Sequence, residues 1–191
     1  MAQPYSARSR AIEPFHVMAL LARANELQAA GHDVIHLEIG EPDFTTAEPI
    51  IKAGQAALSA GKTRYTAARG IPELRGAISG FYQQRYGLDI DPERIMITPG
   101  GSGALLLTSS LLVDPGKHWL LADPGYPCNR HFLRLVEGAA QLVPVGPDMR
   151  YQLTPDLVER YWDQDSVGAL VASPANPCLL YTSPSPRDQR G

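Results

Sequence analysis

The class of fold is decided by residues 94–127, which read RIMITPGGSGALLLTSSLLVDPGKHWLLADPGYP. Two apolar runs, at 94–98 and 119–122, lie on either side of a glycine-rich turn and an apolar stretch with helical spacing at 102–113. We expect the two runs to be strands and the stretch between them to be a helix. A strand, a helix and a strand in this order form the unit from which parallel sheets are built.

The same alternation continues to residue 172. We expect a helix near 129–137, a strand at 141–145, a helix after the cap Thr154 with Pro155 in its first turn, and a strand at 167–172. This spacing predicts an α/β fold, a three-layer sandwich with a mostly parallel sheet. The helix at 102–113 is apolar on nearly all sides, which is typical of a helix packed inside a large protein. We therefore expect the sheet of this chain to be incomplete.

The chain before residue 94 has mainly helical patterns. Helices are expected at 14–30, from about residue 49 to Gly61, and from Pro72 to just before Gly87. A short strand is expected at 35–39, where apolar residues alternate with polar ones.

The composition argues against several classes of protein. The formal net charge is -3 at pH 7 and no basic run is present, so we expect no nucleic-acid partner. No apolar stretch approaches the roughly 18 residues of a membrane span, and residues 1–10 lack the apolar core of a signal peptide. Cys128 and Cys178 have no partner at ligand spacing, so we expect no metal site. These features predict a cytoplasmic protein.

Three turns follow strands of the predicted sheet, at the edge where open α/β folds bind ligands. The first turn, at 98–103, carries Gly100, Gly101 and Ser102 directly before a helix. Free N–H groups at a helix start, approached through glycines, suit a phosphate. A glycine-rich turn of this kind also serves tight packing alone, so both interpretations stand at this point.

The second and third turns add an aromatic ring and an amide. At 123–127, two prolines around a glycine hold Tyr126 in one direction, and a rigid tyrosine suits stacking on a flat ring. At 173–177, Asn176 offers an amide that can donate to a phenolate or carboxylate oxygen. Each turn alone can equally be an ordinary surface turn. At successive strand ends of one sheet, the three turns together predict a pocket for a small anionic compound with an aromatic ring and a phosphate.

Six motifs of this chain resemble, in order, those of the class I and II aminotransferases, which are pyridoxal 5′-phosphate (PLP)-dependent enzymes of fold type I. They are IGEPDF (39–44), GKTRYT (61–66), GIPELR (70–75), TPGGSG (98–103), DPGYP (123–127) and SPANP (173–177). The resemblance spans nearly all of residues 12–177 and implies an N-terminal fragment of an aspartate-aminotransferase-like enzyme. It implies an N-terminal arm and small-domain segment at 1–48 and a partial PLP-binding major domain at 49–177.

The resemblance implies cofactor contacts from each of the three turns. Gly100, Gly101 and Ser102 would hold the PLP phosphate of their own subunit. Tyr126 would stack on the pyridine ring, and Asn176 would hydrogen-bond the 3-oxygen.

The resemblance implies two further contacts from the first part of the chain. The backbone amide of Gly40 would contact the substrate carboxylate, where the plainer interpretation is a strand-ending turn. Tyr65 would reach the PLP phosphate of the neighbouring subunit in a homodimer, where the plainer interpretation is a half-exposed loop tyrosine.

No residue of this chain is assigned to catalysis. After Asn-Pro the family usually continues with Thr-Gly, whereas this chain has Cys178 and Leu179, and we expect the resemblance to end there. The Schiff-base lysine, the aspartate for the pyridine nitrogen and the arginine for the α-carboxylate would follow. The lysines of this chain are Lys52, Lys62 and Lys117, and none follows a motif that would place it at the cofactor's aldehyde.

The expected function of the parent enzyme is PLP-dependent transamination between an amino acid and a 2-oxo acid, with this fragment inactive. One alternative is another fold-type-I PLP enzyme, such as a C–S lyase or a cyclopropane-forming synthase. A second is a non-catalytic, aminotransferase-like regulatory module, which would need a helix-turn-helix segment upstream. The sequence beyond Pro177 would discriminate between them.

Residues 178–191 read CLLYTSPSPRDQRG and show no periodicity. The string resembles a translated sequencing adapter, so we predict a non-native tail rather than a flexible C-terminus. An independent read of the genomic locus should therefore give a different continuation after Pro177. Recovery of the same codons within a longer reading frame would contradict this prediction.

Overall fold

The computed structural model describes residues 5–40, 42, 44–173 and 175–176. The chain divides into two compact units, which we describe separately. One is Pro14–Leu74, and the other joins the described residues of Met1–Glu13 to those of Arg75–Gly191. The domain boundaries expected from the sequence, at residues 48 and 177, stay predictions.

The unit Pro14–Leu74 contains the helices α2 (His16–Ala29) and α3 (Glu48–Ser59), and the next helix, α4 (Pro72–Tyr86), begins at its end. Gly31 and Gly61 follow α2 and α3 with φ angles of +90° and +67°. This left-handed conformation ends a helix and favours glycine. The expected helices of this region are confirmed.

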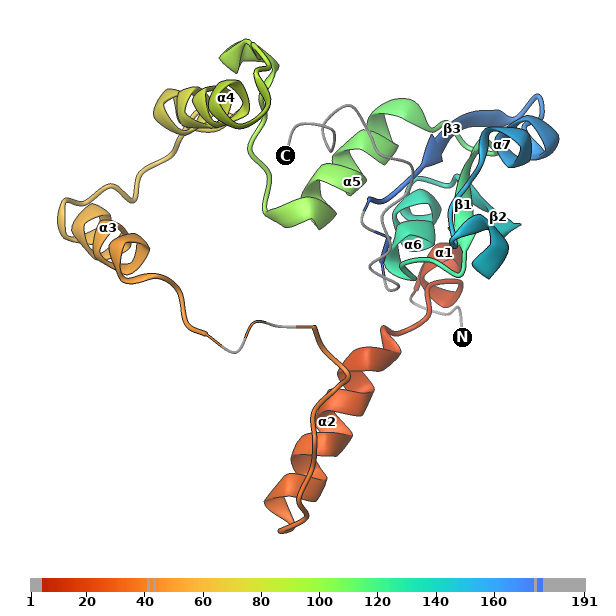
Figure 1. Cartoon of the computed structure of the whole chain (residues 1–191), viewed down its shortest axis with the longest axis horizontal. Helices are drawn as coiled ribbons and strands as arrows, with labels where there is room; N and C mark the ends of the chain where they lie inside the picture. Colours follow the sequence, from red (N-terminus) through yellow and green to blue (C-terminus); the bar gives the residue numbers. More distant parts are fainter. Residues whose placement is uncertain (1–4, 41, 43, 174, 177–191) are drawn as a thin grey trace. The chain divides into compact units, whose positions relative to one another are not determined.

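The strand expected at 35–39 is wrong, because these residues form no regular secondary structure. The segment turns its polar residues toward α2: the ring of His36 contacts Glu38 Oε1 at 2.7 Å and Gln28 Oε1 at 3.3 Å. Figure 1 shows this orange segment running back along α2. Ile35 and Leu37 stay exposed. An alternating pattern becomes a strand only where a neighbouring strand completes its hydrogen bonds, and none of the described residues does so here.

The second unit is built on a parallel sheet of three strands in the order β2-β1-β3. The strands are β1 (His118–Asp123), β2 (Ala139–Pro144) and β3 (Ser166–Leu170), and β1 pairs in parallel with both neighbours. Figure 1 shows the three strands side by side, with α6 next to β1 and β2. The expected α/β class with a parallel sheet is confirmed.

A helix precedes each strand, as the sequence predicts. These helices are α5 (Gly100–Leu112), α6 (Cys128–Leu135) and α7 (Pro155–Tyr161), with short 3₁₀ turns η1 (Pro92–Arg94) and η2 (Pro147–Met149). The hydroxyl of Thr154 caps α7 by accepting a hydrogen bond from Leu157 N at 3.3 Å. A short N-terminal helix, α1 (Ala7–Arg10), is held by an ion pair of 3.1 Å between Arg8 and Glu137.

The strand expected at 94–98 is also wrong. The chain there leaves η1 and continues without regular secondary structure. Just before this run, the guanidinium of Arg75 donates to the Pro92 carbonyl at 3.0 Å and to Glu93 Oε1 at 2.9 Å. The apolar run again lacks a neighbouring strand within the described part of the chain.

The core lies on both faces of β1. Trp119 and Leu121 pack on one face with Val113 of the α5 C-cap and Leu133 of α6. Leu120 and Val143 are fully buried on the opposite face, as the alternation of side chains along a strand requires.

Polar contacts fasten the amino ends of β1 and β3. Lys117 Nζ donates to Asp165 Oδ1 at 2.8 Å, and this hydrogen bond raises the pKa of Lys117. His118 Nε2 lies 2.9 Å from Ser166 Oγ and 3.2 Å from Asp163 Oδ1. The sheet is thus tied at the edge opposite the predicted pocket.

Replacing Gly168 on β3 with alanine should destabilise the sheet. A Cβ atom there would lie 2.7 Å from Nε1 and 2.8 Å from Cδ1 of the Trp119 indole, so the buried ring must move. We expect a loss of about 1–3 kcal/mol in the free energy of unfolding, measured by urea titration of the 191-residue chain with tryptophan fluorescence.

The matched control is Gly54→Ala in α3, where a Cβ atom meets nothing within 4 Å. Alanine is the better helix former, so this variant should be neutral or stabilised by up to about 1 kcal/mol, read by circular dichroism. Equal effects of the two substitutions would contradict the packing of Gly168 against Trp119.

Candidate functional site

The carboxyl ends of the three strands line a cavity of about 90 Å³ in the second unit. Its apolar wall includes Leu121, Leu142 and Leu170, one from each strand. The polar residues that line it are Asp123, Tyr126, Asn129, Arg130, Tyr151, Gln152 and Asn176. A pocket at this edge of a parallel sheet is the usual ligand site of such folds.

The turn after β1 places Tyr126 at the pocket. A Cβ atom on Gly125 would lie 2.5 Å from the Ala122 carbonyl oxygen, so the close approach in this turn requires glycine. The pKa of the half-buried Tyr126 hydroxyl is raised, first by its hydrogen bond with the Cys128 thiol and then by burial. The ring therefore stays neutral at physiological pH.

The turn after β3 places Asn176 at the same pocket. Ala175 is buried and holds the turn against the protein, while Asn176 is exposed beside it. Pro174 and Pro177, which flank these residues in the predicted motif, lie outside the described residues. The structure thus brings Tyr126 and Asn176 together from turns that are far apart in the sequence.

The glycine-rich turn at the start of α5 has open space beside it. Gly100 has a φ angle of +72°, and a Cβ atom on Gly100 or Gly101 would meet nothing within 4 Å. Only Gly103 packs tightly, 3.0 Å from the Pro99 ring. Packing therefore accounts for Gly103 but not for Gly101. Residues 100–102 are exposed and do not line the pocket of Tyr126 and Asn176.

Gly40 and Tyr65 belong to the unit Pro14–Leu74. Gly40 is exposed with open space at its Cα, and Tyr65 is fully exposed in the loop between α3 and α4. Their implied contacts with substrate and with a neighbouring subunit stay predictions.

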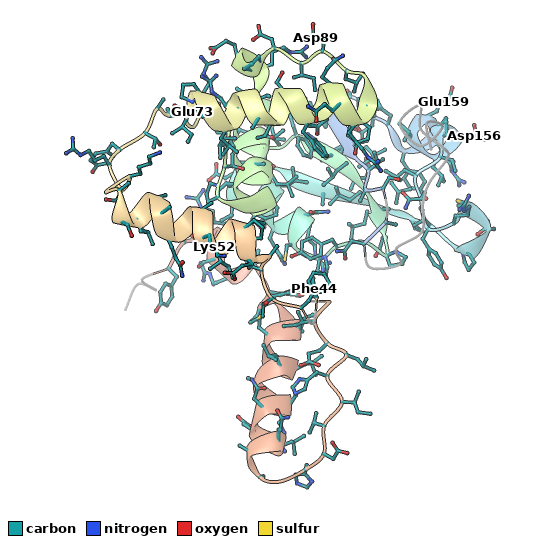
Figure 2. All side chains as sticks on the ribbon, turned by 60° about the vertical axis from the view of Figure 1, so that its left-hand side comes forward. Phe44, Lys52, Glu73, Asp89, Asp156 and Glu159 are labelled. Atoms are coloured by element: carbon teal, nitrogen blue, oxygen red, sulfur yellow. The ribbon has the colours of Figure 1, made fainter. Side chains whose placement is uncertain are left out.

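The three lysines belong to other parts of the chain than the turns that line the pocket. Figure 2 shows Lys52 on α3, where it pairs with Glu48 at 3.4 Å. Lys62 is exposed in the loop after α3, and Lys117 is bound to Asp165 at the opposite edge of the sheet. No lysine is among the described residues that line the pocket.

In the part of the chain that the structure describes, no group of three or more histidine, cysteine, aspartate and glutamate residues could hold a metal ion. None of the helices in that part is both long and apolar enough to cross a membrane.

Sequence reasoning missed four polar residues of the pocket. Asn129 and Arg130 directly follow the predicted Tyr126 turn, so their position in the sequence could have indicated them. Tyr151 and Gln152 come from the turn between β2 and α7. That turn has the unusual backbone of Arg150 and Tyr151, with φ angles of +53° and +55°, and no glycine or asparagine marks these two positions in the sequence.

Comparison with known proteins gives consistent matches. A profile of the family described as "Aminotransferase class I and II" matches residues 32–183, and so runs past Pro177, where the motif resemblance was expected to end. A (5-formylfuran-3-yl)methyl phosphate transaminase of Methanocaldococcus jannaschii is 42% identical over 165 residues, which cover 86% of this chain and 42% of that protein. A valine–pyruvate aminotransferase of Mycobacterium tuberculosis is 39% identical over 166 residues, covering 87% of this chain and 42% of that protein.

Solved structures that resemble this chain are also aminotransferases. An aminotransferase from Mycobacterium tuberculosis superposes with a TM-score of 0.87 at 37% identity, covering 92% of this chain and 45% of that one. An aspartate aminotransferase from Thermus thermophilus gives a TM-score of 0.86 at 33% identity, with 92% and 46% coverage.

This chain spans less than half the length of the relatives it matches. The family profile nevertheless covers most of its residues. The chain belongs to the family of class I and II aminotransferases.

Proposed function

We propose that this chain is the cofactor-binding part of a PLP-dependent transaminase, which passes an amino group from an amino acid to a 2-oxo acid. The observation that carries the proposal is the meeting of Tyr126 and Asn176 at one pocket, on the carboxyl edge of a parallel sheet. Members of this family generally depend on PLP, and the pocket has a flat ring and an amide suited to it.

The residues fit the cofactor in three respects. The open space beside Gly101 leaves room for a group to approach the backbone at the start of α5, where unpaired N–H groups attract an anion. Tyr126 is a neutral aromatic ring on a turn that only glycine at position 125 permits. Asn176 supplies N–H donors at the same pocket.

When bound, PLP supplies the electron sink for the reaction at the amino-acid Cα. The residues of this chain position it: Gly100, Gly101 and Ser102 hold the phosphate, Tyr126 stacks on the ring and Asn176 donates to the 3-oxygen. The Gly40 amide binds the substrate carboxylate. None of these groups moves a proton at the reacting carbon, which needs a lysine that the described pocket lacks.

The substrate pair is proposed only as an amino acid and a 2-oxo acid. The relatives named above are a furan phosphate transaminase, a valine–pyruvate aminotransferase and an aspartate aminotransferase, so similar levels of identity accompany different substrates. All are transaminases, which favours transamination over the lyase and synthase alternatives. We further propose a homodimer in which Tyr65 reaches the partner's phosphate site, and a cytoplasmic location.

Gly101→Asp should weaken PLP binding by tenfold or more in the 191-residue chain. The new carboxylate occupies the space beside the backbone and repels a phosphate at a helix start. Tyr126→Ala removes the ring contact alone and should cost roughly 1 kcal/mol, about fivefold in affinity. Equilibrium dialysis with PLP measures both.

Gly54→Asp is the matched control for charge, because it adds the same side chain at an exposed helix position in the other unit. Its affinity should equal that of the wild type. If Gly101→Asp also binds PLP as tightly as the wild type, residues 100–102 do not hold the phosphate.

The 191-residue chain should not transaminate. Incubated with PLP and amino donors, it should release no 2-oxo acid, because none of its lysines lies at the pocket. Borohydride treatment followed by peptide mass analysis should find no PLP attached at Lys52, Lys62 or Lys117. Turnover that disappears when one of these lysines is replaced would overturn the prediction.

A further inference from the structure

Gln152 combines burial with an unused hydrogen-bonding group. It is 8% exposed and lines the pocket of Tyr126 and Asn176. Its backbone N–H donates to the Met149 carbonyl at 3.1 Å. Its side-chain amide has no hydrogen-bond partner among the described residues.

The Gln152 amide is not one of the fully shielded, unpartnered groups of the core. By contrast, the side-chain oxygen Oε1 of Gln141 on β2 is shielded from solvent and has no hydrogen-bond partner. The amide atoms of Gln152 are not among the shielded atoms. The residue that carries them lines the pocket.

A strained turn fixes Gln152 in this place. Arg150 and Tyr151 both have left-handed backbones, which cost of order 1–3 kcal/mol each in residues other than glycine. Hydrogen bonds to the Gly146 carbonyl from Met149 N, at 3.1 Å, and Tyr151 N, at 2.9 Å, hold the turn. The Thr154 cap of α7 fixes the chain on the other side. Strain of this kind is often kept where it positions a side chain for a ligand.

The chemistry of Gln152 favours an oxygen acceptor on a planar ligand. An amide N–H donates without adding charge, and Asn176 offers the same group at the same pocket. We propose that Gln152 is a second positioning residue for the cofactor, and that its amide donates a hydrogen bond to the 3-oxygen of the ring that stacks on Tyr126. This inference rests on the proposed function, because it takes PLP to be the ligand.

The test is a titration of the 191-residue chain with PLP, followed by dialysis for affinity and by the absorption of bound PLP for the ionisation of its 3-hydroxyl. Gln152→Leu should weaken binding about threefold to tenfold, the usual range for one lost hydrogen bond. It should also move the ionisation of the bound 3-hydroxyl to higher pH, because an N–H donor favours the oxyanion. A purely structural role would not move this ionisation.

Gln141→Leu is the matched control, since it makes the same exchange in the same unit away from the pocket. It should leave both affinity and ionisation unchanged. Gln152→Glu preserves size if the leucine variant folds poorly. Its carboxylate should repel the oxyanion, so the affinity should fall more at high pH than at low pH.

Two results separate this inference from the proposed function. If the wild type binds PLP and Gly101→Asp is impaired, but the Gln152 variants behave as the wild type or as Gln141→Leu, the role of Gln152 is wrong and the proposed function stands. If the wild type does not bind PLP, the proposed cofactor site fails and the inference fails with it.

Discussion

The parallel pairing of β1 with both of its neighbours is the constraint on which the site depends. Because all three strands run in one direction, their last residues, Asp123, Pro144 and Leu170, lie at the same edge of the sheet. The turns that follow them carry Tyr126, Gln152 and Asn176 into one pocket. If one strand ran in the opposite direction, its turn would lie at the amino edge, among the polar contacts of Lys117 and His118. Strand direction therefore decides which side chains reach the pocket, and only then do the individual side chains determine its chemistry.

The sequence predicted elements whose signals are local. Gly31 and Gly61 marked helix ends because their backbone conformation favours glycine, and Thr154 marked a helix start because its hydroxyl caps it. The runs at 35–39 and 94–98 were mistaken for strands because strand formation depends on a partner elsewhere in the chain. Tyr126 could be predicted as a site residue because the prolines and the glycine next to it indicate a rigid turn. Gln152 could not, since the left-handed residues before it carry no sequence signal.

Four glycines of the second unit differ in what surrounds them. Gly125 and Gly168 are required by the protein itself, because a carbonyl oxygen or an indole ring occupies the place of a Cβ atom. Gly101 has only open space in that place, whereas Gly100 has open space but needs glycine for its φ angle of +72°. A glycine that the fold does not need for packing leaves backbone N–H groups accessible from outside. The close contact with the indole ring associates Gly168 with the core, and the open space beside Gly101 leaves room for a ligand at the start of α5.

The polar contacts at the amino edge of the sheet also mark the two ends of a segment that could be exchanged between related proteins. Lys117 and His118 meet Asp163, Asp165 and Ser166, so the chain between them leaves the sheet edge and returns to the same place. That excursion contains α6, β2 and the turn of Gln152, together with Tyr126. Recombination between related genes could exchange this whole segment. The two ends of the new segment would then make the same polar contacts at the amino edge of the sheet. Much of the pocket lining would then change in one inherited piece, while the remaining strand β3 and its asparagine stayed in place.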